Sequence, residues 1–229
     1  MAAAIANLRA SRYPPPMFVP VPCSVDGCVA PALSGSAACV AHTRDCGAWR
    51  ERLTSSPARG QPVRDLGLSG ISLSDADLSG LEVSGCDLSR ASFTRVRFVG
   101  SSLLLVFLDD ASFDGCDFSG SSFQNSVFAG SRLSDCLFTD CEIVQCNFVG
   151  SRCARVRFDH SDLYGCRFTG SRFDGVSIRD CNLTRARFDR AHLMEADFRA
   201  SNTNQALFIE ADPRGGGRYG PERRVGGER

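Results

Sequence analysis

Lysine is missing from this sequence, since all 26 basic residues among the 229 are arginine. They balance 26 acidic residues, so the formal net charge is zero. No apolar run is long enough to cross a membrane, and residues 1–17 lack the charged start and long apolar stretch of a secretory signal. We therefore expect a cytoplasmic protein.

Proline is absent between Val63 and Asp212. A proline would remove one backbone N–H, so its exclusion fits a chain in which each segment is hydrogen-bonded to the next. The motifs of phosphate loops, dinucleotide sites and nucleophile elbows are absent as well. Of three histidines, His160 is expected in a corner ladder of ion pairs and His192 on the surface. These features predict a protein that is not an enzyme.

What the sequence does contain is an apolar residue at every fifth position from Leu68 to Phe208, weakened only at Cys153 and Thr203. Five residues advance about 500° along an α-helix, so the apolar series would wind around every face. In a single strand an odd period would send alternate members to opposite sides. The chain must therefore turn once in every repeat.

A small or modest residue lies two positions before most of these centres, and the glycines of the array lie two positions after a centre. Residues two apart in an extended chain point the same way, so each repeat directs one small and one large side chain inward. Glycine tolerates the tight corner that follows.

The segments Ala76-Asp77-Leu78-Ser79-Gly80 and Cys116-Asp117-Phe118-Ser119-Gly120 resemble the pentapeptide-repeat proteins. The resemblance implies an all-β fold, a right-handed quadrilateral β-helix with four repeats per coil. About seven coils stacked roughly 4.8 Å apart would make a rod of about 34 Å. In such a rod Phe118, Phe138 and Phe158 lie directly over one another. We divide the chain into a flexible arm (1–22), a Cys/His-rich cap segment and linker (23–62), the β-helix (63–212) and a disordered tail (213–229).

Twelve cysteines are present, eight of them within the array. Buried free cysteine behaves as a small hydrophobe, so packing is preferred to redox chemistry, and a reducing compartment is indicated. Seven occupy the small inward position and Cys153 occupies a centre; the seven are Cys86, Cys116, Cys136, Cys141, Cys146, Cys166 and Cys181.

Before the array, Cys23, Cys28, Cys39 and His42 have a spacing that can close a tetrahedral, structural Zn²⁺ site. Cys46 competes with His42 as the fourth ligand, and the alternative is a loop of ordinary cysteines that covers the array.

Residues 44–53 are expected to form a short helix that covers the first coil with Trp49 and Leu53. The tail is too polar to cap the last coil, so we expect a homodimer through that end.

Opposite charges recur twenty residues apart, as at Asp75 and Arg95, so they are expected to meet on adjacent coils. Like charges also recur, in the column Arg132, Arg152 and Arg172. This anion column is either a site for an acidic partner or a duplicated Gly-Ser-Arg triplet whose charge repulsion is relieved by Asp114 or Asp174, and the second interpretation is preferred.

Acidic residues concentrate in the first half of the array. The candidate partner-binding acidic face is Asp77, Glu82, Asp87, Asp109, Asp110, Asp114, Asp117, Glu142 and Asp162.

The sequence predicts a non-enzymatic scaffold that binds a protein partner. The alternative follows from the resemblance, because the quinolone-resistance branch of the family mimics DNA and binds DNA gyrase, which gives protection from gyrase inhibitors. The arginine column and the near-neutral second half depart from that type. A weaker hypothesis is a zinc-dependent nucleic-acid binder that uses Arg44, Arg50, Arg52 and Arg59; direct nucleic-acid binding is not expected, since the acidic half would repel DNA.

Overall fold

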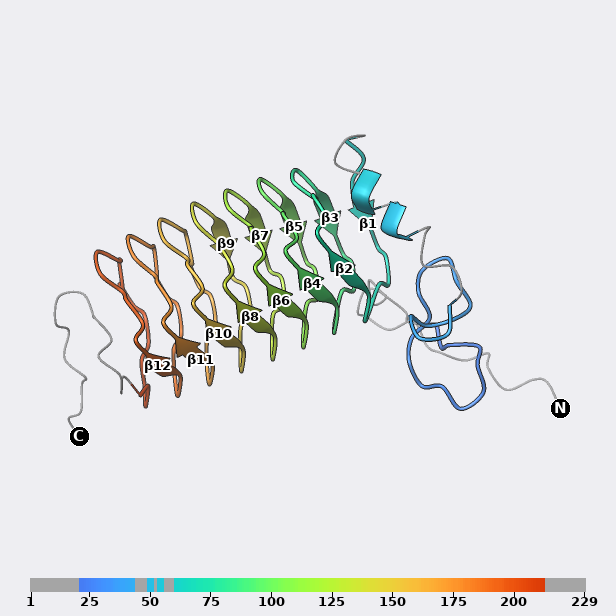
Figure 1. The fold of residues 1–229 in the computed structure, drawn as a ribbon. Coiled ribbons are helices and arrows are strands. Elements are labelled where there is room, and N and C mark those ends of the chain that lie inside the picture. The colour runs from blue at the N-terminus through green and yellow to red at the C-terminus, as the bar shows by residue number, and fades with distance from the viewer. Residues whose placement is uncertain (1–20, 44–48, 52, 56–59, 213–229) are drawn as a thin grey trace, which may run out of the picture.

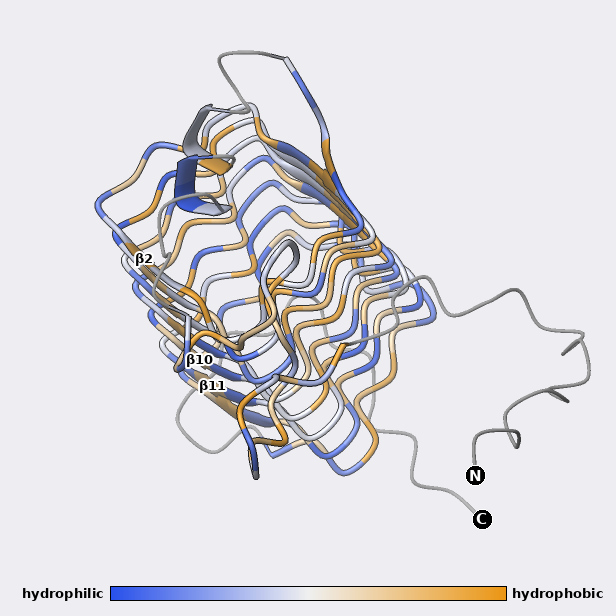
Figure 2. Ribbon diagram, turned by 90° about the vertical axis from the view of Figure 1, so that its right-hand side faces the viewer, coloured by the Kyte–Doolittle hydropathy of each residue, from blue (hydrophilic) through white to orange (hydrophobic). Residues whose placement is uncertain are grey.

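The computed structural model describes residues 21–43, 49–51, 53–55 and 60–212. From Val63 onward the chain forms a stack of coils (Figure 1). The apolar centres of the repeats from Leu68 to Phe198 are buried inside this stack. Figure 2 views the rod at an angle from its N-terminal side and shows the coils stacked one behind another. The all-β, quadrilateral β-helix expected from the repeat is confirmed.

Two opposite sides of the rod carry parallel sheets. Side 1 holds the five-stranded sheet β1 (Val63–Arg64), β3 (Glu82–Ser84), β5 (Ser102–Leu104), β7 (Ser122–Gln124) and β9 (Glu142–Val144). Side 3 holds the seven-stranded sheet β2 (Ser72–Ser74), β4 (Ser92–Thr94), β6 (Ser112–Asp114), β8 (Arg132–Ser134), β10 (Arg152–Ala154), β11 (Arg172–Asp174) and β12 (His192–Met194).

The other two sides consist of isolated parallel bridges. Side 2 includes the bridge between Asp87 and Phe107, and side 4 includes the bridge between Asp77 and Arg97. On every side a residue pairs with the one twenty positions later, as Leu133 does with Cys153. Twenty residues per coil are thereby established, and outward side chains of the same column become neighbours.

The interior is filled by the repeat centres. Phe138 is fully buried, and its ring stacks on Phe118 at 4.5 Å and on Phe158 at 5.1 Å between centroids. The predicted stack is therefore confirmed. Burying an aromatic side chain in a dry, close-packed core is the main favourable term available to a rod of this kind.

Some of the small inward residues have a second task, because their hydroxyl or thiol groups form hydrogen bonds with backbone groups. Ser121 Oγ donates to the carbonyl of Phe98 at 2.6 Å and accepts the N–H of Ser101 at 3.0 Å. Cys141 Sγ donates to the carbonyl of Phe118 at 3.0 Å. Burial raises the pKa of Cys141 to about 12, so its thiol stays neutral and structural, as the packing interpretation requires.

Each corner residue adopts a left-handed backbone conformation, and the position is filled by glycine or by a residue such as Asp110 (φ 54°) or Asn125 (φ 51°). Asparagine and aspartate tolerate this region better than other residues with a Cβ. The corners therefore turn without needing glycine at every repeat.

The segment before the rod covers its first coil. The amide of Ser34 donates to the carbonyl of Gly67 at 2.8 Å, and the amide of Gly67 donates to Ser34 Oγ at 2.7 Å. Trp49 and Leu53, in the helical residues 49–51 and 53–55, are buried in the same cluster as the rod core. Within its described residues the predicted covering helix is confirmed; its start at Arg44 lies outside them.

No helix in the described part of the chain is long and apolar enough to cross a membrane. The predicted arm lies almost entirely outside the described residues, and the predicted tail lies wholly outside them.

Candidate functional site

The first candidate site is the cluster of Cys23, Cys28, Cys39 and His42. An antiparallel bridge between Pro22 and Pro31 closes the hairpin that carries the first two cysteines. The carbonyl of Cys39 accepts the N–H of His42 at 3.0 Å, so a tight turn presents the last two ligands together. One ligand atom from each of the four residues lies within 4.8 Å of the others. The predicted set is therefore assembled, and it can hold a metal ion.

Three of the distances within the cluster are close to the edges of a zinc tetrahedron. Cys28 Sγ and Cys39 Sγ are 3.8 Å apart, and His42 Nδ1 lies 3.4 Å from the sulfurs of Cys23 and Cys39. Zinc bonds of about 2.3 Å to sulfur and about 2.0 Å to nitrogen would require edges of about 3.8 Å between sulfurs and about 3.5 Å between sulfur and nitrogen. The cysteines are free thiols. Cys46, the competing ligand, lies outside the described residues.

The local backbone favours a thiolate in this cluster. The amide of Cys39 donates to Cys23 Sγ at 3.4 Å, and this bond, with a second from the Val25 backbone and the His42 ring, lowers the pKa of Cys23 to about 6. A thiolate is the form of cysteine that binds metal. The lowered pKa of Cys23 thus favours its metal-binding form, whereas desolvation and the neighbouring Cys39 and Cys23 thiols raise the pKa of Cys28.

The second candidate site is the arginine column on side 3. Arg152 pairs in register with Arg132 in the preceding coil and with Arg172 in the following one, and all three side chains are exposed. None of the three has a carboxylate ion-pair partner among the described residues. Two paired arginines, Arg95 and Arg155, differ in this respect, because their guanidiniums lie 2.6 Å from the nearest oxygen of Asp75 and Asp135 respectively.

Asp114 and Asp174 lie on the same sheet as the column, at the ends of β6 and β11. The hydrogen bond that Arg155 donates to Asp135 is the largest cause of the raised pKa of Arg155, and the charges of Asp174 and Asp114 raise it further. Neither forms an ion pair with the column in the described part of the structure. The relief of repulsion that the sequence suggested at these two residues is not provided by direct contact.

The nine acidic candidates do not share one side of the rod. Side 1 carries Glu82, Glu142 and Asp162, and side 2 carries Asp87 and Asp109, with Asp110 at the corner that follows. Side 3 carries Asp114, and side 4 carries Asp77 and Asp117. Asp77 and Asp117 lie on either side of Arg97, and Asp77 pairs with it at 3.2 Å. Side 2 brings three acidic residues together at Asp87, Asp109 and Asp110.

Glu142 and Asp162, which are neighbours on side 1, have polar partners. Glu142 accepts a hydrogen bond from Ser122 Oγ at 3.3 Å, and Asp162 accepts one from Asn182 at 2.9 Å. At the corners, His160 Nδ1 lies 3.9 Å from Asp180, so one contact of the expected ladder is present.

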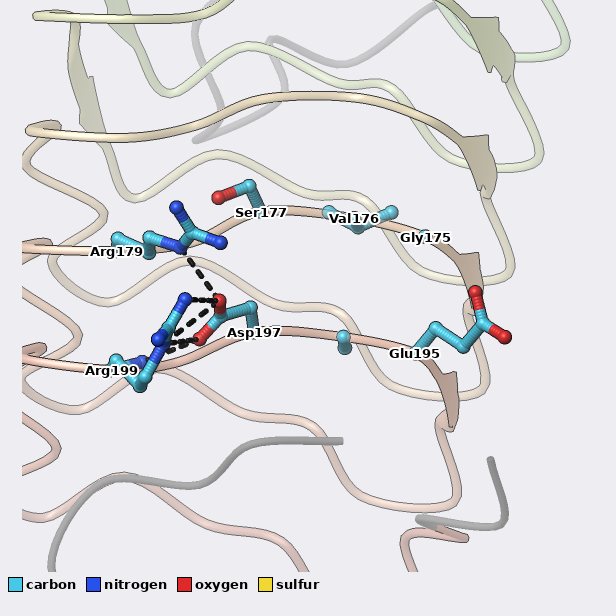
Figure 3. Close-up of a pocket in the computed structure, with 8 residues that line it drawn as sticks. Gly175, Val176, Ser177, Arg179, Glu195, Asp197 and Arg199 are labelled. Carbon is cyan, nitrogen blue, oxygen red and sulfur yellow. Dashed lines mark hydrogen bonds and ion pairs between the residues drawn. The ribbon is translucent and has the colours of Figure 1, made fainter. Parts of the chain in front are cut away.

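A shallow groove on side 4, not predicted from the sequence, is lined by Ser177, Arg179, Asp197 and Arg199 (Figure 3). Asp197 accepts hydrogen bonds from Arg199 at 2.7 Å and from Arg179 at 2.6 Å. These guanidiniums, Arg199 first, hold the pKa of Asp197 well below its usual range. Asp197, Arg179 and Arg199 therefore satisfy one another.

The arginines proposed as phosphate contacts are accounted for only in part. Arg50 lies 3.5 Å from the carbonyl oxygen of Ser72 and so contacts the rod. Arg44, Arg52 and Arg59 lie outside the residues whose side chains are described.

Comparison with known sequences and structures gives a family and several similar folds. Family descriptions of pentapeptide repeats match residues 106–147 (nine copies) and residues 68–103, 136–175 and 151–190 (eight copies), which together exceed half of the chain. No curated protein matches the chain.

Three solved structures illustrate the similar folds. QnrB1, a plasmid-mediated fluoroquinolone resistance protein, has 19% identity and a TM-score of 0.48, with 66% of this chain and 78% of that chain covered. HetL, involved in heterocyst differentiation regulation in the cyanobacterium Nostoc sp. strain PCC 7120, has 16% identity and a TM-score of 0.34, with 75% and 95% covered. A thylakoid-lumen protein of Arabidopsis thaliana has 20% identity and a TM-score of 0.25, with 54% and 67% covered.

Proposed function

Because the chain belongs to the pentapeptide-repeat family, we propose that it is a non-enzymatic scaffold that binds a protein partner on the outside of the rod. The observation that carries this proposal is the column Arg132, Arg152 and Arg172, three exposed guanidiniums in register without carboxylate partners among the described residues. Its ligand is an acidic protein surface.

The energetic argument begins from the spacing of the coils. Like charges about 4.8 Å apart repel by about 1 kcal/mol in water, and by more near a low-dielectric surface. Elsewhere on the rod, pairs such as Asp75 with Arg95 remove this repulsion within the chain. Carboxylates of a partner would remove it at the column, and guanidinium groups are well suited to bind them through two hydrogen bonds each.

The test is a titration of the full chain with fluorescein-labelled poly-glutamate, followed by anisotropy at low ionic strength. We expect the wild type to bind and Arg132→Gln/Arg152→Gln/Arg172→Gln to bind about tenfold more weakly or worse, since each charged contact contributes about 1.5–3 kcal/mol at best. The matched control is Arg95→Gln/Arg97→Gln/Arg155→Gln, which removes the same charge from arginines that already have partners. Equal loss in both variants would contradict a role for the column.

A second candidate is the gyrase-binding alternative, which the acidic group Asp87, Asp109 and Asp110 favours. A local cluster of carboxylates can enter a protein groove built for phosphates. Mimicry along the whole rod is less favoured, because the acidic residues are spread over four sides and Asp77 is paired. A supercoiling assay with purified DNA gyrase tests this candidate; an unchanged supercoiling rate at micromolar protein eliminates it.

For the Cys/His cluster we propose structural Zn²⁺. Support comes from the clustering of the ligand atoms of Cys23, Cys28, Cys39 and His42 within 4.8 Å of one another. Four protein ligands leave no position for a reactive water, so the ion would stabilise the segment rather than perform chemistry. Free thiols throughout the described chain are consistent with a reducing, cytoplasmic setting.

We also propose that a second copy of the chain covers the C-terminal end of the rod. Phe208 stacks on Phe188 at 4.8 Å, and Leu207 and Ile209 in the same coil are exposed by 40% and 59%. A twofold contact between two such ends would bury these side chains and the open coil edge.

A further inference from the structure

An apolar edge lies on the N-terminal half of the rod. Leu104, Leu105 and Phe107 follow one another around the corner between sides 1 and 2, and their exposed fractions are 40%, 37% and 37%. In the described rod, exposed large apolar side chains occur only at this edge and in the last coils, from Met194 onward. Most other outward positions are polar or small, so the edge departs from the pattern of the repeat.

Leu105 is exceptional even within this edge, because it is a corner residue with φ 54°. The left-handed region costs a residue with an ordinary side chain about 1–2 kcal/mol. The same corner holds Gly85 in the preceding coil and Asn125 in the following one, which are residues that tolerate this conformation. The corner itself therefore does not require leucine.

Acidic residues border the edge. Asp87 is bridged in register to Phe107, and Asp109 and Asp110 follow Phe107 in the chain. Partial burial raises the pKa of Asp109, and the neighbouring carboxylates of Asp87 and Asp110 raise it further against the opposing charge of Arg90. The three carboxylates thus give the edge a negative rim.

We propose that Leu104, Leu105 and Phe107, with the rim of Asp87, Asp109 and Asp110, form a docking surface for a partner protein segment that combines apolar side chains with arginine or lysine. Apolar anchors surrounded by complementary charge are typical of the centre and rim of protein interfaces. The proposal rests on the proposed scaffold function. It concerns a different surface from the arginine column, which lies on side 3, and a partner of opposite charge.

The test uses three labelled synthetic peptides of equal length, titrated into the full chain that carries Arg132→Gln/Arg152→Gln/Arg172→Gln, so that a glutamate-containing peptide cannot bind at the arginine column. One alternates leucine with arginine, one alternates serine with arginine, and one alternates leucine with glutamate. We expect only the leucine–arginine peptide to bind tightly, because it alone satisfies both the apolar edge and the acidic rim. Equal binding of the serine–arginine peptide would overturn the proposal by showing attraction through charge alone, and equal binding of the leucine–glutamate peptide would overturn the role of the rim.

Leu105→Asn and Phe107→Ser are the diagnostic variants. Each should weaken the leucine–arginine peptide about tenfold, the loss typical of an interface anchor. Asn125→Gly, in the same corner column one coil later, is the matched control and should bind as the wild type does. Leu105→Asn should unfold at the same temperature as the wild type or higher, since asparagine suits a left-handed corner. Full affinity in both diagnostic variants would contradict the docking surface.

Two further measurements distinguish the apolar edge from the arginine column and from a contact between two copies of the chain. Poly-glutamate binding by Leu105→Asn should remain unchanged, so a failure here is distinguishable from a failure of the arginine column. Light scattering of Leu105→Asn should give the wild-type mass. A change in mass would show that the edge contacts a second copy of the chain, and would overturn the assignment to a basic partner.

Discussion

At the scale of single residues, the two inward side chains of each repeat have different physical roles. The large centre packs in the interior, as Phe138 does between Phe118 and Phe158. This role could be predicted, because a period of five places apolar side chains on one side of the chain only if the chain turns once in every repeat. The small residue also binds the backbone, as Ser121 does with the carbonyl of Phe98. The sequence showed only its size, since the carbonyl it reaches lies 23 residues earlier in the chain.

Phe138→Ala tests the packing role. The ring is fully buried between two aromatic neighbours, so its removal should lower the free energy of unfolding by about 3–5 kcal/mol. Urea denaturation followed by circular dichroism measures the change. Phe107→Ala is the control, because that ring is exposed at the surface and its loss should cost less than about 1 kcal/mol. A similar cost at both positions would argue against a filled interior.

Asp197 should make stability sensitive to acid. Arg199 and then Arg179 lower the folded-state pKa of Asp197 below the unfolded value of about 3.9. The carboxylate therefore stabilises the fold fully above about pH 4 and loses this contribution as the pH falls further. Thermal unfolding of the wild type and Asp197→Asn between pH 7 and pH 2 checks this, and we expect the gap between them to shrink below pH 4. A constant gap would be inconsistent with the ion pairs.

At the scale of elements, the sequence predicted which residues of the cap segment cluster together. For the surface columns it predicted which residues are neighbours on adjacent coils, but not which side chains contact each other. Cysteine spacing predicted that Cys23, Cys28, Cys39 and His42 lie together, because two short turns can bring such pairs together. The hydrogen bonds between Ser34 and Gly67 could not be foreseen, since nothing in the pattern of either residue indicates a docking contact. Likewise the sequence placed Asp174 near the arginine column, but side-chain direction decides which charge it contacts.

The cap should contain one Zn²⁺ per chain. Elemental analysis of purified wild-type protein should find it, and Cys39→Ser should lose it because a thiolate ligand is removed. Cys181→Ser, a buried rod thiol outside the cluster, is the matched control and should retain the metal. Comparing His42→Ala with Cys46→Ser identifies the fourth ligand. Equal metal content in wild type and Cys39→Ser would exclude Cys39 as a ligand.

At the scale of the whole molecule, the protein is a solid rod whose ends differ. Ser34, Trp49 and Leu53 cover the first coil, whereas Leu207 and Ile209 are exposed in the last. The resemblance to pentapeptide-repeat proteins made this architecture predictable, because it implies twenty residues per coil and one register then fixes every column. The identity of a partner is not encoded by that register, since outward side chains may vary without disturbing the core.

Ile209→Glu should convert a dimer into a monomer, because a charge would be buried where the two C-terminal ends meet. Light scattering coupled to size-exclusion chromatography measures the mass. Ser74→Glu, exposed near the opposite end, is the control and should leave the mass unchanged. A wild-type monomer at micromolar concentration would contradict the proposed homodimer.

The central claim is that a partner protein is held by Arg132, Arg152 and Arg172, and photo-crosslinking in cells of the native host tests it most directly. A photoreactive residue at Ala154, beside the column on β10, should form a discrete adduct with one protein, whereas the same residue at Val144 on the opposite sheet should not. The adduct should disappear when the three arginines are changed to glutamine. An adduct that survives this change, or an identical one formed from Val144, would contradict the account.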